Sequence, residues 1–298
     1  DAVFVPGGDP GHTQPKHMMA LLEKETQVLH RTHPKAQMWM SPQGFTQAWT
    51  DEFLAIMKTQ PAWLSGIVFA PQNRLSLPDL RAAIPAQYPI RHYPDITHTY
   101  SCQYPVQDWD VAYKLTQDRE VINPRPLEET KIFQWSRPLT CGFITYSEGC
   151  NDDVNKILWS ALGWDSSADT FDILRQYARY FIGPEYENTF ANQLLALEKN
   201  WTGPLLTNAG VMTTLQQAQD MERQVTPQVP LNWRFQHMLY RSYFDAYVQR
   251  RLVYETELEQ RSRHSSGHAL TWLWRMSPKS IVRRLQSFRW ESNSRRTG

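Results

Sequence analysis

The sequence predicts an α/β fold: the last five strand–helix units of an eight-stranded (β/α)8 barrel, followed by an all-α region. Short apolar runs alternate with helical patterns through the first half, and the runs begin near positions 3, 37, 66, 90 and 143. After the fifth run, helical patterns follow one another directly. Alternation at this spacing indicates parallel strands joined by right-handed crossovers. Strands that are apolar along their whole length are typical of a sheet covered on both faces.

The first half contains the predicted strands and the helices between them. The strands are expected at residues 2–5, 37–40, 66–69, 90–93 and 143–146, and the helices at 15–30, 46–58 and 77–84. Pro15 suits a first helical turn, because proline lacks an N–H that would be unpaired there in any case. The stretch 101–140 is irregular and rich in proline, with short helical patterns near 109–115 and 128–133.

The second half is predicted to be helical throughout. A helix follows the fifth strand, with Asn151 or Asp152 placed to cap it. Further helices are expected at 169–182, 185–199, 213–223 and 231–260. The predicted organisation is therefore a barrel portion at 1–150 and a helical domain at 151–298, with a basic tail from 276 onward.

Five strand–helix units do not close an eight-stranded barrel. We therefore expect the full protein to carry three further units before Asp1. An open, doubly wound sheet is the competing fold. That fold usually carries a GxGxxG fingerprint after its first strand, whereas residues 7–11 read GGDPG and have a different spacing.

Composition limits the classes of partner. The 31 basic and 30 acidic residues leave a net charge of +1, so no global charge favours nucleic acid or an anionic membrane. No apolar run approaches the length of a membrane span. The 12 Trp and 13 Tyr fit a large core or a site that stacks rings on sugars. Cys141 and Cys150 flank one strand, too far apart for a disulfide, which needs Cα atoms within about 7 Å. We expect neither of these two residues to be catalytic, and Cys102, the third cysteine, does not indicate a mechanism.

Three acids follow predicted strands directly, and they are the candidate catalytic residues. Asp9 follows the first strand, Asp95 the fourth and Glu148 the fifth. The carboxyl ends of barrel strands meet at one mouth, where active sites lie. Cleavage of a glycosidic bond needs two carboxyl groups in different environments, one a proton donor and the other a nucleophile or base. The alternative is structural, because aspartates often form turns and acids often stand at helix N-termini.

Other side chains at the same strand ends are suited to binding a sugar. Neither a metal-ligand spacing nor a cofactor motif accompanies them, so no metal or cofactor is expected. The candidates for binding hydroxyl groups or stacking on rings are His12, Trp39, Gln43, Gln72, His98, Tyr100, Trp109, Tyr146 and Asn151.

Residues 143–183 resemble the junction between barrel and helical domain in glycoside hydrolases of the α-glucuronidase and β-N-acetylhexosaminidase type. The similarity lies in the strand before Glu148, the WSALGWD segment at 159–165 and LRQYARYFIG at 174–183. It implies a (β/α)8 barrel, a carbohydrate substrate, paired acids and a periplasmic or secreted location. The acidic pair that hexosaminidases carry after their fourth strand is here Gly8-Asp9, a single acid, which argues against substrate-assisted cleavage.

The sequence thus predicts a hydrolase that cleaves glycosidic bonds without a metal. Asp9 would take the acid/base position and Asp95 would face it, while Glu148 would bind substrate or share the catalytic work. The substrate would be an oligosaccharide or glycoside, with no nucleic acid or membrane partner. A non-catalytic carbohydrate-binding protein is the alternative. A metal-dependent amidohydrolase is a third, and the absence of His-x-His at any predicted strand end counts against it.

Overall fold

The computed structural model describes residues 1–6 and 12–265. The chain divides into two compact units, Asp1–Val248 and Gln249–Gly298. The predicted catalytic Asp9 and the predicted basic tail at 276–298 lie outside the described residues. Within the described residues, no helix combines the length and the apolar character that crossing a membrane requires.

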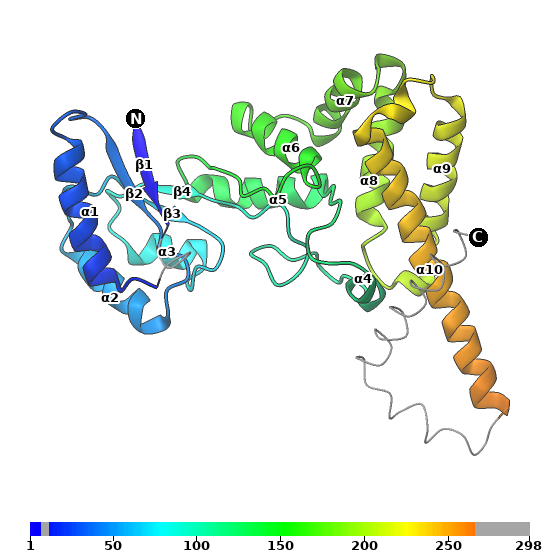
Figure 1. Ribbon diagram of the computed structural model, residues 1–298, viewed down its shortest axis with the longest axis horizontal. Helices are drawn as coiled ribbons and strands as arrows, with labels where there is room; N and C mark the ends of the chain where they lie inside the picture. Colours follow the sequence, from blue (N-terminus) through cyan, green and yellow to red (C-terminus); the bar gives the residue numbers. More distant parts are fainter. Residues whose placement is uncertain (7–11, 266–298) are drawn as a thin grey trace, which may run out of the picture. The chain divides into compact units, whose positions relative to one another are not determined.

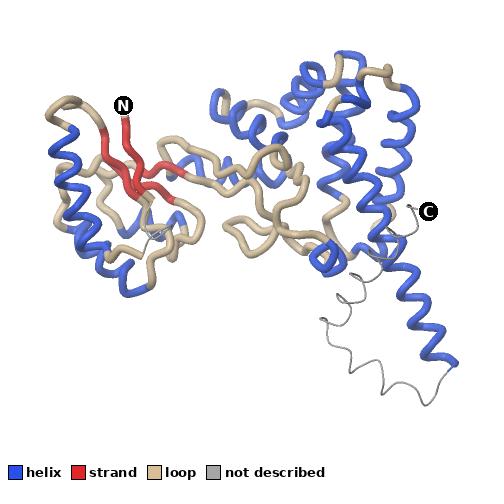
Figure 2. The backbone as a smooth tube through the Cα atoms, viewed as in Figure 1, coloured by secondary structure: helices blue, strands red, loops and turns tan. Residues whose placement is uncertain are grey.

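A parallel sheet forms the first part of this unit (Figures 1 and 2). Its strands stand in the sequential order β1-β2-β3-β4, and every neighbouring pair is parallel. A helix joins each strand to the next, as the alternating sequence pattern predicts. The elements are β1 (Ala2–Val5), α1 (Pro15–Leu29), β2 (Gln37–Met40), α2 (Gln47–Lys58), β3 (Gly66–Phe69), α3 (Leu77–Ala83) and β4 (Ile90–His92).

The predicted eight-stranded barrel is wrong, because the described residues form a sheet of four strands. The expected fifth strand, 143–146, lies parallel to β4 but is joined to it only by isolated bridges, His92 with Phe143 and Asp95 with Tyr146. The ladder breaks at Pro94, whose nitrogen has no hydrogen to donate. The carbonyl of Pro94 still accepts the Tyr146 N–H at 2.8 Å. The competing doubly wound sheet also differs, since its strand order reverses and this order does not.

The core of the sheet region explains why α1, α2 and α3 form where they do. Side chains alternate across a strand, so one face of the sheet presents Met38, Met40, Ile67 and Phe69 to the helices. Apolar helix positions at spacings of three and four cover that face. Thr46 and Ser76 cap α2 and α3 by accepting backbone N–H groups. The helix residues in this core include Met18, Met19, Leu22, Phe53, Met57, Leu77 and Leu80.

The remaining helices lie within and after the irregular stretch, and from α6 onward the described residues form helices without a further strand. Tyr177, Phe190, Leu194, Phe235 and Met238 form the centre of their core. Asp152 does occupy the N-cap position of α6, but its carboxylate makes no capping hydrogen bond. The helices are α4 (Val111–Thr116), α5 (Pro126–Ser136), α6 (Asp153–Trp164), α7 (Thr170–Phe181), α8 (Glu187–Lys199), α9 (Gly210–Gln224) and α10 (Trp233–Ser265).

Candidate active site

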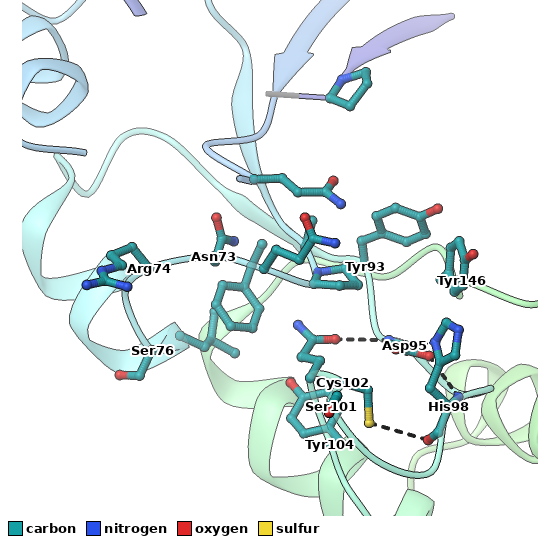
Figure 3. A pocket seen from close by; sticks show the side chains of 18 of the residues that line it. Asn73, Arg74, Ser76, Tyr93, Asp95, His98, Ser101, Cys102, Tyr104 and Tyr146 are labelled. Carbon is teal, nitrogen blue, oxygen red and sulfur yellow. Dashed lines mark hydrogen bonds and ion pairs between the residues drawn. The ribbon is translucent and has the colours of Figure 1, made fainter. Parts of the chain in front are cut away.

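A cavity of about 920 Å³ lies at the carboxyl ends of the strands. Its walls come from the loop after β3, the loop after β4, residues 119–120 and the segment around Tyr146 and Glu148. Figure 3 shows these loops converging, with Asp95, His98 and Tyr146 on one side and Asn73 and Arg74 on the other. The cavity therefore stands where the parallel sheet brings together the ends of strands that are distant in sequence.

Asp95 is buried and its carboxylate is fully occupied. One oxygen accepts the backbone N–H groups of Thr97 at 3.1 Å and His98 at 3.2 Å. The other oxygen accepts Nδ1–H of the His98 ring at 2.8 Å. Asp95 lines the cavity but exposes only 2% of its surface. Its position fits a residue that fixes the turn after β4 and orients His98.

His98 presents its other ring nitrogen to the cavity. The ring packs against Tyr146 with centroids 5.7 Å apart and planes 18° apart. Its Nε2 lies 3.2 Å from Oε1 of Glu120. The contacts with Asp95 and Tyr146 leave the ring little freedom, so Nε2 is held at one place in the cavity wall.

Glu148 is exposed, yet its backbone is firmly placed. Its N–H donates to Thr97 Oγ1 at 3.1 Å and to Asp152 Oδ2 at 3.3 Å. The buried Asp152 also accepts the hydroxyl groups of Thr97 and Ser147. Asp152 thus joins the segment of Glu148 to the loop that carries His98, which explains why it does not cap α6.

Glu120 is a carboxylate of the cavity that the sequence patterns did not indicate. Its carbonyl accepts Asn151 Nδ2 at 3.2 Å, and the carbonyl of Arg119 accepts the N–H of Thr99 at 3.0 Å. One oxygen of Glu120, one of Glu148 and a ring nitrogen of His98 all lie within 4.8 Å of one another. Glu120 lies in the irregular stretch 101–140, remote from any strand end, so no motif or spacing marks it.

Several predicted binding residues do line the cavity. Gln43, Gln72, His98 and Tyr146 are among its walls. Gln72 has φ of 64°, a conformation that residues other than glycine rarely adopt, and its carbonyl accepts the N–H of Gly44 at 3.2 Å. This contact links the loops after β2 and β3 at the cavity edge.

The other predicted residues lie elsewhere. Trp39 is buried across Gly66, where an added Cβ would meet the indole at 2.2 Å, with Arg91 over its ring at 4.6 Å. Tyr100 packs on Trp109, and Trp109 packs on Trp201 with centroids 5.2 Å apart. Asn151 anchors Glu120 from outside the cavity, and His12 is exposed outside its walls.

Two titratable groups in or beside the cavity are held in their uncharged forms: Cys102 lines the cavity, and the buried His92 contacts the lining residue Tyr104. Burial, with the nearby charge of Asp95, raises the pKa of the Cys102 thiol to about 11, so it stays protonated and hydrogen-bonds the His98 carbonyl. The three cysteines are free. Burial lowers the pKa of His92 to about 3. The neutral His92 ring lies 2.9 Å from the Tyr104 hydroxyl and 3.2 Å from Ser136.

Two buried amide side chains in the cavity wall have unused hydrogen-bonding atoms. Among the described residues, Asn73 Oδ1 and Nδ2 and Gln103 Nε2 have no hydrogen-bond partner. Both residues line the cavity. Buried polar atoms are rarely left unpaired in proteins, and each costs about 1–3 kcal/mol when unsatisfied. These atoms are suited to a polar ligand.

No protein-family model matches this chain, and no curated protein matches it in sequence. The geometry of the cavity is therefore the basis for any functional assignment.

Proposed function

We propose that the cavity binds a carbohydrate and hydrolyses a glycosidic bond, with Glu120 and Glu148 as the paired carboxylates. The observation that carries this proposal is the pair itself. Two glutamates from separate loops bring carboxylate oxygens within 4.8 Å of each other in a cavity large enough for sugar units. Glycoside hydrolysis needs two such groups flanking one bond.

The spacing of the pair favours the retaining mechanism. Carboxyl groups about 5–5.5 Å apart leave no room for a water molecule, so one attacks the sugar directly, whereas inverting pairs stand about 6.5–9.5 Å apart. Glu120, whose Oε1 faces His98, would attack the anomeric carbon. Glu148, which has no ion-pair partner among the described residues, would protonate the leaving oxygen and then activate water.

The cavity wall also offers the surfaces that a sugar requires. Tyr93, Tyr146 and Trp135 contribute aromatic rings, which pack on the apolar faces of pyranose units. The unused amide atoms of Asn73 and Gln103 can hydrogen-bond sugar hydroxyls. In this proposal Asp95 is a positioning residue, and the ring stacking that the sequence assigned to Trp39 and Trp109 falls to Trp135.

Substitution of each glutamate tests the proposal. We expect Glu120→Gln and Glu148→Gln to lower kcat on aryl glycosides by a factor on the order of 10² or more, with little change in Tm because both residues are exposed. Glu25→Gln, an exposed site on α1, is the matched control and should keep full turnover. If the wild type cleaves glycosides and both cavity variants keep a kcat near that of the wild type, Glu120 and Glu148 are not the catalytic pair.

Binding without cleavage is the second candidate. The exposure of Glu120, whose side chain is 50% accessible, favours it, because a general acid usually works in a desolvated site. A wild type that binds oligosaccharides by calorimetry but releases no product from any glycoside in the panel would establish this alternative.

A further inference from the structure

We propose that His98, Glu120 and Glu148 form a site for a divalent transition-metal ion, of the chemistry of Zn²⁺. The three side chains come from three separate loops and converge on one point of the cavity wall. An imidazole nitrogen with two carboxylate oxygens is a donor set that suits Zn²⁺. Three protein ligands leave a further position open for water or another small molecule.

The hydrogen bonds of the His98 ring are those of a metal ligand. The Asp95 carboxylate is an acceptor, because its other oxygen already receives two backbone N–H groups. The His98 proton therefore sits on Nδ1, directed at Asp95 at 2.8 Å. A neutral ring then has its lone pair on Nε2. A ligating histidine in proteins commonly donates its other N–H to a carboxylate in this way.

The contact on the far side of the ring needs a proton or a metal ion between the two atoms. Nε2 lies 3.2 Å from Oε1 of Glu120, so without either one two lone pairs would face each other. A proton shared by His98 and Glu120 or a bound metal ion resolves this repulsion. Glu148, whose carboxylate oxygen is also within 4.8 Å, adds a second negative charge at the same point, which favours a divalent ion over a single proton.

The backbones behind the three ligands are joined, while the ligands themselves can adjust. Thr97 and Asp152 fix the N–H of Glu148, Thr99 binds the carbonyl of Arg119, and Asn151 binds that of Glu120. Metal–ligand bonds of about 2.0–2.2 Å in a tetrahedron place ligand atoms about 3.4 Å apart. The exposed side chains of Glu120 and Glu148 can rotate the short distance needed, since they have little packing to break.

Metal binding would regulate the hydrolysis proposed above, and this consequence alone depends on that proposal. An ion held by Glu120 and Glu148 takes both carboxylates out of reaction. Zn²⁺ should therefore inhibit cleavage of an aryl glycoside, and a chelator should restore it. The site itself is tested by binding, without any turnover.

Calorimetric titration of the chelator-treated full chain with ZnCl₂ tests the site. Cys141 and Cys150 are exposed thiols, so all proteins in the test carry both as serine. We expect one specific site in the parent protein and at least a tenfold weaker affinity in Glu120→Gln and in Glu148→Gln. Glu25→Gln should bind as the parent does, and MgCl₂ should bind far more weakly than ZnCl₂.

Two results would overturn the proposal. One is a Zn²⁺ affinity that is the same in the parent protein, in Glu120→Gln and in Glu148→Gln. Surface histidines would then be the source of binding. The other is an NMR spectrum in which the His98 ring of the chelator-treated protein carries protons on both nitrogens and does not shift when Zn²⁺ is added. In that case a proton, rather than a metal, lies between His98 and Glu120.

Discussion

Two groups of polar and charged residues in this molecule differ in whether the protein itself satisfies their hydrogen bonds. In the helical region, Arg241 and Asp245 are almost fully buried, and Asp245 also accepts hydrogen bonds from Asn200 and Trp201. In the cavity, Glu120 and Glu148 are exposed, and neighbouring amide atoms have no partner among the described residues. The first network is complete within the protein. The second leaves buried polar atoms in the cavity wall without a partner among the described residues, and for this reason we propose the cavity as the functional region.

The comparison predicts that the largest loss of stability comes from the helical network. Arg241 donates to Asp245, to the carbonyl of Leu197 and to that of Ile122. Asp245→Ala would leave this guanidinium buried without its counter-charge, which usually costs about 3–5 kcal/mol. Urea denaturation should show this decrease in the free energy of unfolding.

An exposed ion pair supplies the control for that measurement. Asp220 pairs with Arg223 on the surface of α9, with both side chains about half exposed or more. Asp220→Ala should change the free energy of unfolding by less than about 1 kcal/mol. Equal losses in Asp245→Ala and Asp220→Ala would show that the buried network is not the stabilising element that its geometry suggests.

A second prediction uses the pH dependence of a buried acid in the same helical region. Burial raises the pKa of Glu129 to about 7, and the charge of Arg125 opposes the rise. Between pH 4.5 and 7 the folded protein therefore holds a proton that the unfolded chain has lost. Because unfolding releases that proton, the contribution of Glu129 to stability falls as pH rises through this window, by about 3 kcal/mol in total.

The variant Glu129→Gln isolates this contribution. A glutamine keeps an acceptor for the Trp159 N–H, which now donates to Glu129 at 2.9 Å, but it does not titrate. The stability of the wild type relative to Glu129→Gln, measured in urea at pH 4.5 and at pH 7.5, should decrease toward the higher pH. A difference independent of pH would contradict the raised pKa. The exposed Glu25→Gln should show no such change.

The individual strands and helices of the sheet region were predictable, while the number of strands that pair into the sheet was not. Apolar runs and caps such as Thr46 and Ser76 are short-range signals, and they located the four strands and the helices between them. The fifth strand has the right composition, but Pro94 on its neighbour interrupts the hydrogen-bond ladder. That effect depends on pairing between residues about 50 apart in sequence, which the composition of a single run does not report.

The site was predictable only where it follows strand ends. Asp95 and Glu148 were predicted because each comes directly after an apolar run, and both line the cavity. The sequence could not show that backbone N–H groups and His98 already donate to the Asp95 carboxylate. Glu120 was missed because it reaches the cavity from an irregular loop, held there by Asn151 and Thr99. Sequence patterns predict helices and strands, but they do not predict the path of an irregular loop such as the one that places Glu120 in the cavity wall.

The smallest predicted effect separates cavity tryptophans from structural ones. Trp135 lines the cavity with 46% of its surface exposed, whereas Trp39 is 3% exposed and covered by Gly66 and Arg91. Ring stacking contributes about 0.5–1.5 kcal/mol. We therefore expect Trp135→Ala to raise Kd for a bound oligosaccharide by up to about tenfold, with a change in Tm of a few degrees at most.

Trp39→Phe should give the opposite result in the same two measurements. The smaller ring leaves a void over Gly66 and loses the hydrogen bond from the indole N–H to Gln37, so Tm should fall, since buried large-to-small changes are destabilising. The Kd of the folded protein should not change, because no part of the Trp39 ring is among the cavity walls. A rise in Kd for Trp39→Phe with none for Trp135→Ala would place the sugar at Trp39, one of the residues that the sequence predicted to stack on it, and would move the site away from Glu120 and Glu148.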